Sequence, residues 1–175
     1  MTTRPPSFCP DCGTELGRTT EEGYDRAYCP ACSAVVYHNP VPGAGVLVRD
    51  GADLLLVRRA TAPHVGQWTV PGGHVETGES PAEAAARELG EEAGLAVDPA
   101  ALDPVSTHAL GPRDGKYTVS VLFETTRAAT DGDPAAGSDA GDVGWFDART
   151  VRDGGADVEV RGFVREGLRR VLDGD

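Results

Sequence analysis

Carboxylate side chains gather in the segment from residue 79 to residue 92, at a spacing that could hold a metal ion. On a helix that turns 100° per residue, Glu88 and Glu92 lie about 40° apart, and Glu91 falls within the same flank of roughly 100°. Like charges at this spacing destabilise an isolated helix by about 0.2–0.5 kcal/mol per pair, so the cluster favours a bound cation. Oxygen ligands select Mg²⁺, Mn²⁺ or Ca²⁺. Taken alone, an E-x-x-E-E pattern is more often a solvated acidic face.

A second group of chemistry-bearing residues is the set of cysteines near the N-terminus. Cys9-Pro-Asp-Cys12 and Cys29-Pro-Ala-Cys32 form two C-x2-C pairs separated by 16 residues, a spacing typical of a zinc site with four thiolates. We expect structural Zn²⁺, with iron or a redox role as the alternatives. A closed thiolate site leaves no open position for catalysis, so the expected roles are folding support, an oligomer contact or part of a substrate lid.

The carboxylates must be positioned by a helix, and the flanking residues predict one. Ser80 is a suitable N-cap, Pro81 suits the first helical position, and Glu83 completes a capping box. Gly94 supplies a C-terminal stop. The residues that we expect on the buried face are Ala82, Ala85, Ala86, Leu89 and Ala93.

Strand patterns surround this helix. Two apolar runs, residues 44–50 and 53–59, are joined by Gly51-Ala52 and predict a hairpin. Further predicted elements are strands over residues 102–110, 116–127 and 143–146, a loop over 128–141 and a closing helix over 160–172. The character of the chain changes near His38, so we predict a small zinc module over residues 1–38 and a larger domain over 39–175.

Composition and charge exclude several classes of function. The chain has 175 residues and a formal net charge of -12, which argues against a nucleic-acid partner because phosphate binding needs surplus Lys and Arg. No apolar run approaches the roughly 18 residues of a membrane span, and the N-terminus lacks the apolar core of a signal peptide. We therefore expect a cytoplasmic protein. Lys116 is the single lysine among many acids, a composition that resembles proteins of salt-loving microbes and that a high-GC genome also favours.

The segment from Gly73 to Leu95 resembles the signature of the Nudix hydrolase family, G-x5-E-x7-R-E-U-x-E-E-x-G-U with U apolar, at every restricted position. This resemblance overturns the interpretation as a solvated acidic face. It implies an α/β fold, namely an α/β/α sandwich with a mixed sheet, here preceded by the zinc ribbon. It also implies an enzyme that uses Mg²⁺ or Mn²⁺ to hydrolyse a pyrophosphate bond in a small nucleotide.

The same resemblance assigns roles to individual residues. Glu88, Glu91 and Glu92 would bind the divalent metal together with the backbone carbonyl of Gly72. Glu79 would pair with Arg87 and hold the preceding loop against the helix. Arg87 could also form a surface pair with Glu83, and both pairings could coexist. Arg58 would contact a substrate phosphate. Glu88 is the first choice for the general base, and the other acids considered for this role are Glu124, Asp139 and Asp142.

The sequence indicates the substrate less clearly than it indicates the reaction. A zinc ribbon joined to this signature resembles the NADH pyrophosphatase branch, yet the S-Q-P-W-P-F-P-x-S marker of that branch is absent after residue 95. ADP-ribose or a similar sugar nucleotide is therefore the leading expectation, ahead of NADH and nucleoside triphosphates. A nucleotide-binding regulator without hydrolytic activity is the alternative from another class, and a homodimer is left open. The aromatic residues considered for base stacking are Trp68, Tyr117, Phe123 and Trp145.

Overall fold

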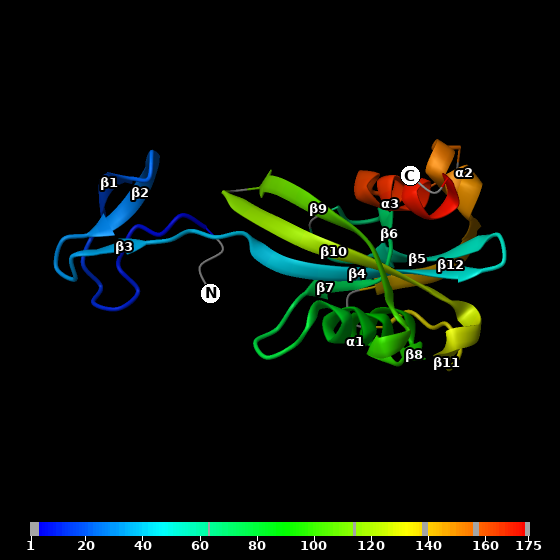
Figure 1. The fold of residues 1–175 in the computed structure, drawn as a ribbon. Coiled ribbons are helices and arrows are strands. Elements are labelled where there is room, and N and C mark those ends of the chain that lie inside the picture. The colour runs from blue at the N-terminus through cyan, green and yellow to red at the C-terminus, as the bar shows by residue number, and fades with distance from the viewer. Residues whose placement is uncertain (1–3, 63, 114, 138–139, 156–157, 174–175) are drawn as a thin grey trace. The chain divides into compact units, whose positions relative to one another are not determined.

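The structure of this chain is a computed structural model that describes residues 4–62, 64–113, 115–137, 140–155 and 158–173. The chain divides into two compact units (Figure 1). One comprises residues 1–41 with 109–118, and the other comprises residues 42–108 with 119–175. The sequence analysis expected a single division of the chain, between residues 38 and 39, and this division stays a prediction.

The first unit contains a three-stranded antiparallel sheet in the order β1-β2-β3. Its strands are β1 (Gly17–Glu21), β2 (Tyr24–Cys29) and β3 (Ala34–Val36). The first cysteine pair lies in a tight turn, in which the Gly13 amide donates to the Cys9 carbonyl at 2.9 Å and the Cys9 amide to the Thr14 carbonyl at 2.8 Å. The second pair follows directly from the end of β2, because Cys29 is its last residue.

A seven-stranded sheet forms the centre of the larger unit, with the main path β12-β5-β4-β10-β9, while β6 pairs with β5 and β7 with β4. Its strands are β4 (Val41–Asp50), β5 (Asp53–Arg59), β6 (Trp68–Thr69), β7 (Gly72–His74), β9 (Asp103–Arg113), β10 (Lys116–Thr126) and β12 (Ala140–Asp147). The predicted hairpin is confirmed, since Arg49 pairs with Leu54 and Asp50 with Asp53. The predicted strands over 102–110 and 116–127 correspond to β9 and β10.

Helices cover both faces of this sheet (Figure 1), which confirms the predicted α/β/α sandwich. The helices are α1 (Pro81–Ala93), α2 (Ala148–Asp153) and α3 (Gly162–Asp173). Val46 and Val48 of β4 pack in the core with α1, whereas Leu47 points to the other face and packs with α2 and α3. The central strands are therefore apolar on both faces, as expected for a sheet that is buried between helices.

The loop predicted over residues 128–141 contains short regular elements that the sequence analysis did not predict. A short 3-10 helix, Arg127–Ala129, leads into β11 (Thr130–Asp131), which pairs antiparallel with β8 (Ala96–Val97). The predicted strand over 143–146 is longer at both ends, and α2 was not predicted at all. These elements were missed because strands of two residues and a helix of six carry too little periodicity to be recognised.

Candidate functional site

Helix α1 is fixed at both ends, as its sequence predicted. The Ser80 amide donates to Glu83 Oε2 at 2.7 Å and the Glu83 amide donates to Ser80 Oγ at 3.2 Å, which completes the capping box. Gly94 ends the helix with φ 70°, a left-handed conformation that favours glycine. Ala85, Leu89 and Ala93 are buried as expected, and Ala84 joins them in the core. The helix is therefore a fixed support for its acidic side chains.

Arg87 is the centre of the acidic cluster. Its Nε and Nη2 donate to the two Glu79 oxygens at 2.7 and 3.2 Å. Its Nη1 donates to Glu88 Oε1 at 2.9 Å and to Glu91 Oε2 at 3.2 Å, while Nη2 also donates to the His74 carbonyl at 3.0 Å. A guanidinium has five N–H donors, so this network uses all of them. The predicted pairing with Glu79 is present. The Glu83 carboxylate instead accepts a hydrogen bond from the Ser80 amide in the helix cap.

This network also sets the charges of the cluster. The Arg87 guanidinium beside Glu79 lowers the pKa of that carboxyl, with a smaller contribution from the Glu76 amide, which donates to Glu79 Oε2 at 3.0 Å. The hydrogen bond with Glu79 likewise raises the pKa of Arg87, and the neighbouring Glu88 adds to this increase. Both groups are therefore held in their charged forms. Arg87 acts as an internal counter-ion that keeps several carboxylates together.

The backbone of Gly72 and Gly73, the first two residues of β7, lies directly against the carboxylates. The Gly72 amide donates to Glu92 Oε2 at 2.9 Å, and Glu92 is only 6% exposed. A Cβ on Gly72 would lie 2.5 Å from the Ala44 carbonyl oxygen, and a Cβ on Gly73 would overlap the Glu88 carboxylate. Gly72 is thus required for the close approach of β7 to β4, and Gly73 leaves room for the Glu88 carboxylate. The structure brings Gly72 together with Glu92 and Gly73 together with Glu88, and Arg87 joins Glu88 to Glu91.

A third segment supports the same end of α1, and it was missed in the sequence. The Ala135 amide donates to the Ala93 carbonyl at 2.9 Å, and the Gly137 amide donates to the Glu92 carbonyl at 3.2 Å. These bonds satisfy carbonyls that the end of a helix leaves without partners. A Cβ on Gly137 would lie 2.7 Å from the Glu91 carbonyl oxygen. The glycines in this Ala- and Gly-rich stretch were the signal of a close backbone approach.

Two of the other acids considered as general bases, Glu124 and Asp142, are paired elsewhere. Glu124 Oε2 lies 3.2 Å from Arg49 Nη2, between β10 and β4. Asp142 Oδ2 lies 3.3 Å from Nη2 of Arg58, the predicted phosphate contact, between neighbouring positions of β12 and β5. The Arg58 side chain is 46% exposed and keeps donors for a ligand. Asp139 lies outside the described residues.

The aromatic residues considered for base stacking have different environments. Phe123 is buried in the core beside α1, and Trp145 packs against that core. Trp68 meets the Phe146 ring at 4.7 Å in an edge-on contact. Tyr117 is 47% exposed and its ring lies 6.5 Å from that of His38, within the first unit. Of the residues considered, Tyr117 is therefore the most exposed ring.

The cysteine cluster is brought together as the spacing predicted. All four Sγ atoms lie within 4.8 Å of one another, with 3.5 Å between Cys12 and Cys29 and 4.0 Å between Cys9 and Cys32. Tetrahedral zinc with bonds of about 2.3 Å would require sulfur separations of about 3.8 Å, so the cluster fits Zn²⁺. The Thr14 hydroxyl, 3.2 Å from Cys12 Sγ, lowers the pKa of that thiol to about 6, while hydrogen bonding with Cys12 raises the pKa of Cys32 to about 12.

Comparison with known proteins assigns the fold and the carboxylate helix to a family. The sequence profile of the NUDIX domain matches residues 39–166, and this chain belongs to the NUDIX family. A crystal structure of a NUDIX hydrolase from Nitrosomonas europaea superposes with a TM-score of 0.77 and is 28% identical, covering 96% of this chain and 91% of that one.

The matches to curated relatives cover a smaller part of this chain than the match to that crystal structure does. The chain is 39% identical over 93 residues to an NAD-capped RNA hydrolase NudC from Stutzerimonas stutzeri, which is 53% of this chain and 32% of that protein. It is 32% identical over 115 residues to an ADP-ribose pyrophosphatase from Methanocaldococcus jannaschii, 65% of each protein. The chain thus spans about a third of the NudC length and under two thirds of the pyrophosphatase.

Among the residues that the structure describes, no helix combines the length and the apolar character that crossing a membrane requires.

Proposed function

We propose that this chain is a Mg²⁺-dependent pyrophosphohydrolase that cleaves ADP-ribose or a similar sugar nucleotide. The observation that carries this proposal is the packing of Gly72 against Glu92 and of Gly73 against Glu88, with Arg87 linking Glu88 to Glu91. Similarity to an ADP-ribose pyrophosphatase supports the choice of substrate. Similarity to NudC favours NADH or an NAD-capped RNA as the second candidate, and nucleoside triphosphates follow.

The carboxylates of Glu88, Glu91 and Glu92, with the Gly72 carbonyl, would hold Mg²⁺ or Mn²⁺, since carboxylate and carbonyl oxygens suit these ions. A metal bound there supplies charge neutralisation on the phosphates and a more acidic water. Glu79 and Arg87 act as positioning residues, because every Arg87 donor is already engaged within the chain.

Two further roles concern the chemistry at the phosphates. Arg58 would bind a substrate phosphate with the donors that its ion pair with Asp142 leaves available. Glu88 stays the first choice for the base that accepts the proton of the attacking water. Arg87 Nη1 donates to Glu88 Oε1 at 2.9 Å, which fixes the orientation of the carboxylate.

The cysteine module is proposed to bind structural zinc through Cys9, Cys12, Cys29 and Cys32, within a module over residues 1–38 that precedes a catalytic domain over 39–175. We also propose a cytoplasmic location, because the structure contains free thiols and no disulfide among its described residues. A salt-tolerant protein and a homodimer remain part of the proposal. The leading substrate is a small nucleotide and involves no nucleic-acid partner, whereas the NAD-capped RNA of the second candidate would be one.

Turnover assays test the proposed activity directly. The purified protein is incubated with ADP-ribose, NADH, an NAD-capped RNA and ATP, with and without Mg²⁺, at low and at molar salt. We expect AMP and ribose phosphate from ADP-ribose only when Mg²⁺ is present. Glu92→Gln should abolish this turnover, whereas the exposed control Glu76→Gln should retain it. Normal turnover by Glu92→Gln would refute the metal assignment, and binding of ADP-ribose without hydrolysis would favour the regulator.

A further inference from the structure

Thr69, the last residue of β6, carries a buried hydroxyl group. The residue is 4% exposed, and its Oγ1 has no hydrogen-bond partner among the residues that the structure describes. The other buried side-chain atoms without a partner in the described part of the chain are Nε of Arg49 and Nε of Arg165, and a guanidinium has further donors. A buried hydroxyl without a partner lowers the stability of the folded state, and a valine at this position would avoid that cost.

The Thr69 side chain lies on the face of the sheet that α1 covers. Trp68 and Val70, its neighbours along the chain, pack in the core cluster that contains residues of α2 and α3. Successive side chains of an extended segment point to opposite faces, so Thr69 points to the other face. Its partner in β5, Val57, packs in the core with Leu89 of α1. Because directly paired residues share a face, the pairing agrees with the alternation.

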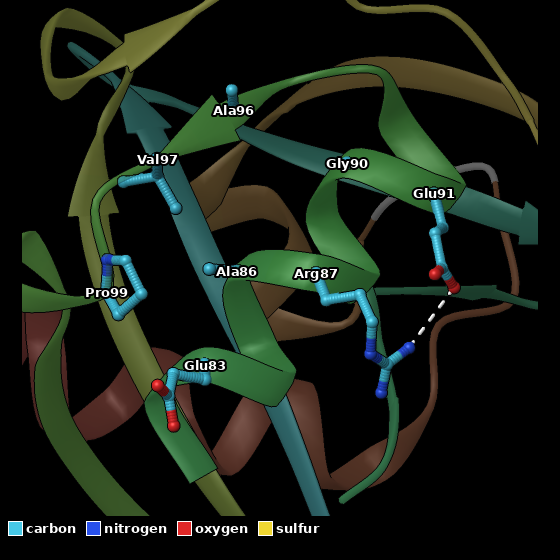
Figure 2. Close-up of a pocket in the computed structure, with 8 residues that line it drawn as sticks. All are labelled: Glu83, Ala86, Arg87, Gly90, Glu91, Ala96, Val97 and Pro99. Atoms are coloured by element: carbon cyan, nitrogen blue, oxygen red, sulfur yellow. Dashed lines mark hydrogen bonds and ion pairs between the residues drawn. The ribbon is translucent and has the colours of Figure 1, made fainter. Parts of the chain in front are cut away.

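The acidic cluster on α1 has an exposed side and a buried side. Figure 2 shows Arg87 and Glu91, which form an ion pair at 3.2 Å, and the Glu91 side chain is 50% exposed. Glu92 is 6% exposed and therefore marks the buried side. Water satisfies polar groups on the exposed side, whereas a polar group on the buried side needs a defined partner.

The segments on either side of Thr69 in the sheet both lead to Glu92. Gly72 follows Thr69 by three residues, which places their Cα atoms within about 11 Å of each other. The Gly72 amide donates to Glu92 Oε2 at 2.9 Å. On the opposite edge of β5 lies β12, and Gly137, shortly before β12 begins, donates its amide to the Glu92 carbonyl at 3.2 Å. Thr69 thus belongs to the buried side of the cluster.

We propose that the Thr69 hydroxyl is part of the metal site, where it forms a hydrogen bond with a water molecule bound to the divalent ion. Mg²⁺ keeps several of its water molecules in proteins, and groups around a metal orient its ligands through hydrogen bonds. A hydroxyl can both donate and accept, so it suits a bound water. Thr69 is then a positioning residue, since it acts on the ion through that water. This inference rests on the proposed function, because it adds a residue to the same site.

Thr69→Val removes the hydroxyl and retains a branched side chain, and Thr125→Val is the matched control. Thr125 is 6% exposed, but its Oγ1 donates to the Ala101 carbonyl at 3.0 Å, so the same substitution there breaks an existing bond. In thermal unfolding without metal, Thr69→Val should be at least as stable as the wild type. Thr125→Val should lower the thermal midpoint by about 2–8 °C.

Calorimetric titration with MnCl₂ measures the metal site without substrate, and Glu92→Gln identifies the signal of this site because it should remove it. We expect Thr69→Val to bind Mn²⁺ about tenfold or more weakly than the wild type, as is typical when a partner of a metal ligand is lost. Thr69→Ser keeps the hydroxyl and should restore the affinity, and Thr125→Val should bind Mn²⁺ as the wild type does. Equal affinity of the wild type and Thr69→Val overturns the inference. A lower thermal midpoint of Thr69→Val also overturns it, because the hydroxyl would then have a structural role.

The titration separates this inference from the proposed function. A protein that hydrolyses no nucleotide, yet binds Mn²⁺ more weakly after Thr69→Val, fails the proposed function and supports the inference. A protein that hydrolyses ADP-ribose, yet binds Mn²⁺ equally well after Thr69→Val, supports the function and overturns the inference.

Discussion

Replacing Arg87 by lysine keeps the positive charge and removes the planar fork, so it tests whether hydrogen-bond geometry holds the acidic cluster together. Arg87 donates to Glu79, Glu88, Glu91 and the His74 carbonyl through all five of its N–H groups. An ammonium has three donors, so at least two of these bonds must be lost. The Arg87 side chain is 29% exposed and that of Glu88 is 14% exposed, so the network is largely shielded from water.

The expected loss in the free energy of unfolding follows from the hydrogen bonds that lysine cannot make. A hydrogen bond to a charged group contributes about 1.5–3 kcal/mol when buried. Solvent access at this site reduces that contribution to about 1 kcal/mol for each bond. We therefore expect Arg87→Lys to lower the free energy of unfolding by about 2 kcal/mol, which corresponds to a fall of roughly 4–8 °C in the thermal midpoint of the larger unit.

The measurement is a thermal unfolding scan by circular dichroism, at constant salt and without added metal. Arg18→Lys is the control, because Arg18 pairs with Asp25 through side chains that are 60% and 68% exposed. That substitution should leave the thermal midpoint unchanged, since exposed ion pairs contribute little. An unchanged midpoint in Arg87→Lys would show that the five bonds do not stabilise the domain, and Arg87 could then not be the residue that holds the acidic cluster together.

Three further predictions concern Gly73, the pH dependence and the zinc module. Gly73→Ala should reduce kcat for the preferred substrate by about 100-fold while leaving the fold intact, because a Cβ there overlaps the Glu88 carboxylate; normal kcat with an intact circular dichroism spectrum would contradict this. The pKa of Glu79 is lowered by Arg87, so its stabilisation is present above the ordinary glutamate value near 4.5 and is lost as the pH falls through the lower value of the folded state. Urea midpoints measured between pH 7 and pH 3 should therefore fall less steeply in Glu79→Gln than in the wild type, and equal slopes would exclude this contribution. Elemental analysis should find zinc in the purified protein and none in Cys29→Ser, and a folded protein without zinc would refute the zinc assignment.

The acidic helix could be predicted from the sequence because its determinants are local. The cap at Ser80, the stop at Gly94 and the spacing of Glu88, Glu91 and Glu92 all lie within one segment, and the period of the helix converts that spacing directly into a shared flank. Strands with strong apolar patterns were predictable for the same reason. The pairing of Arg87 with Glu79 could be expected from the family resemblance.

Contacts that depend on tertiary structure could not be predicted in this way. The ion pair between Arg58 and Asp142 depends on the register of β12 against β5, which no local pattern specifies. The bond from the Ala135 amide to the Ala93 carbonyl requires the path of a whole loop. The position of Ala96 and Val97 beside Gly90 could not be predicted either, because they form the two-residue strand β8 and strands of two residues carry no readable alternation.

The charge of the cluster gives a physical reason why the proposed site would need a metal. The guanidinium of Arg87 contacts the carboxylates of Glu79, Glu88 and Glu91, and Glu92 lies on the same helix against Gly72. The formal charges of these four carboxylates and the guanidinium sum to -3. The guanidinium is sufficient to assemble the cluster, but the charge that remains repels a diphosphate. Each ionised carboxylate has about four lone-pair positions, so Arg87 and a divalent ion can share Glu88 and Glu91 without competing for every oxygen. Arg87 therefore organises the carboxylates, whereas the proposed metal would make the site attractive to a diphosphate.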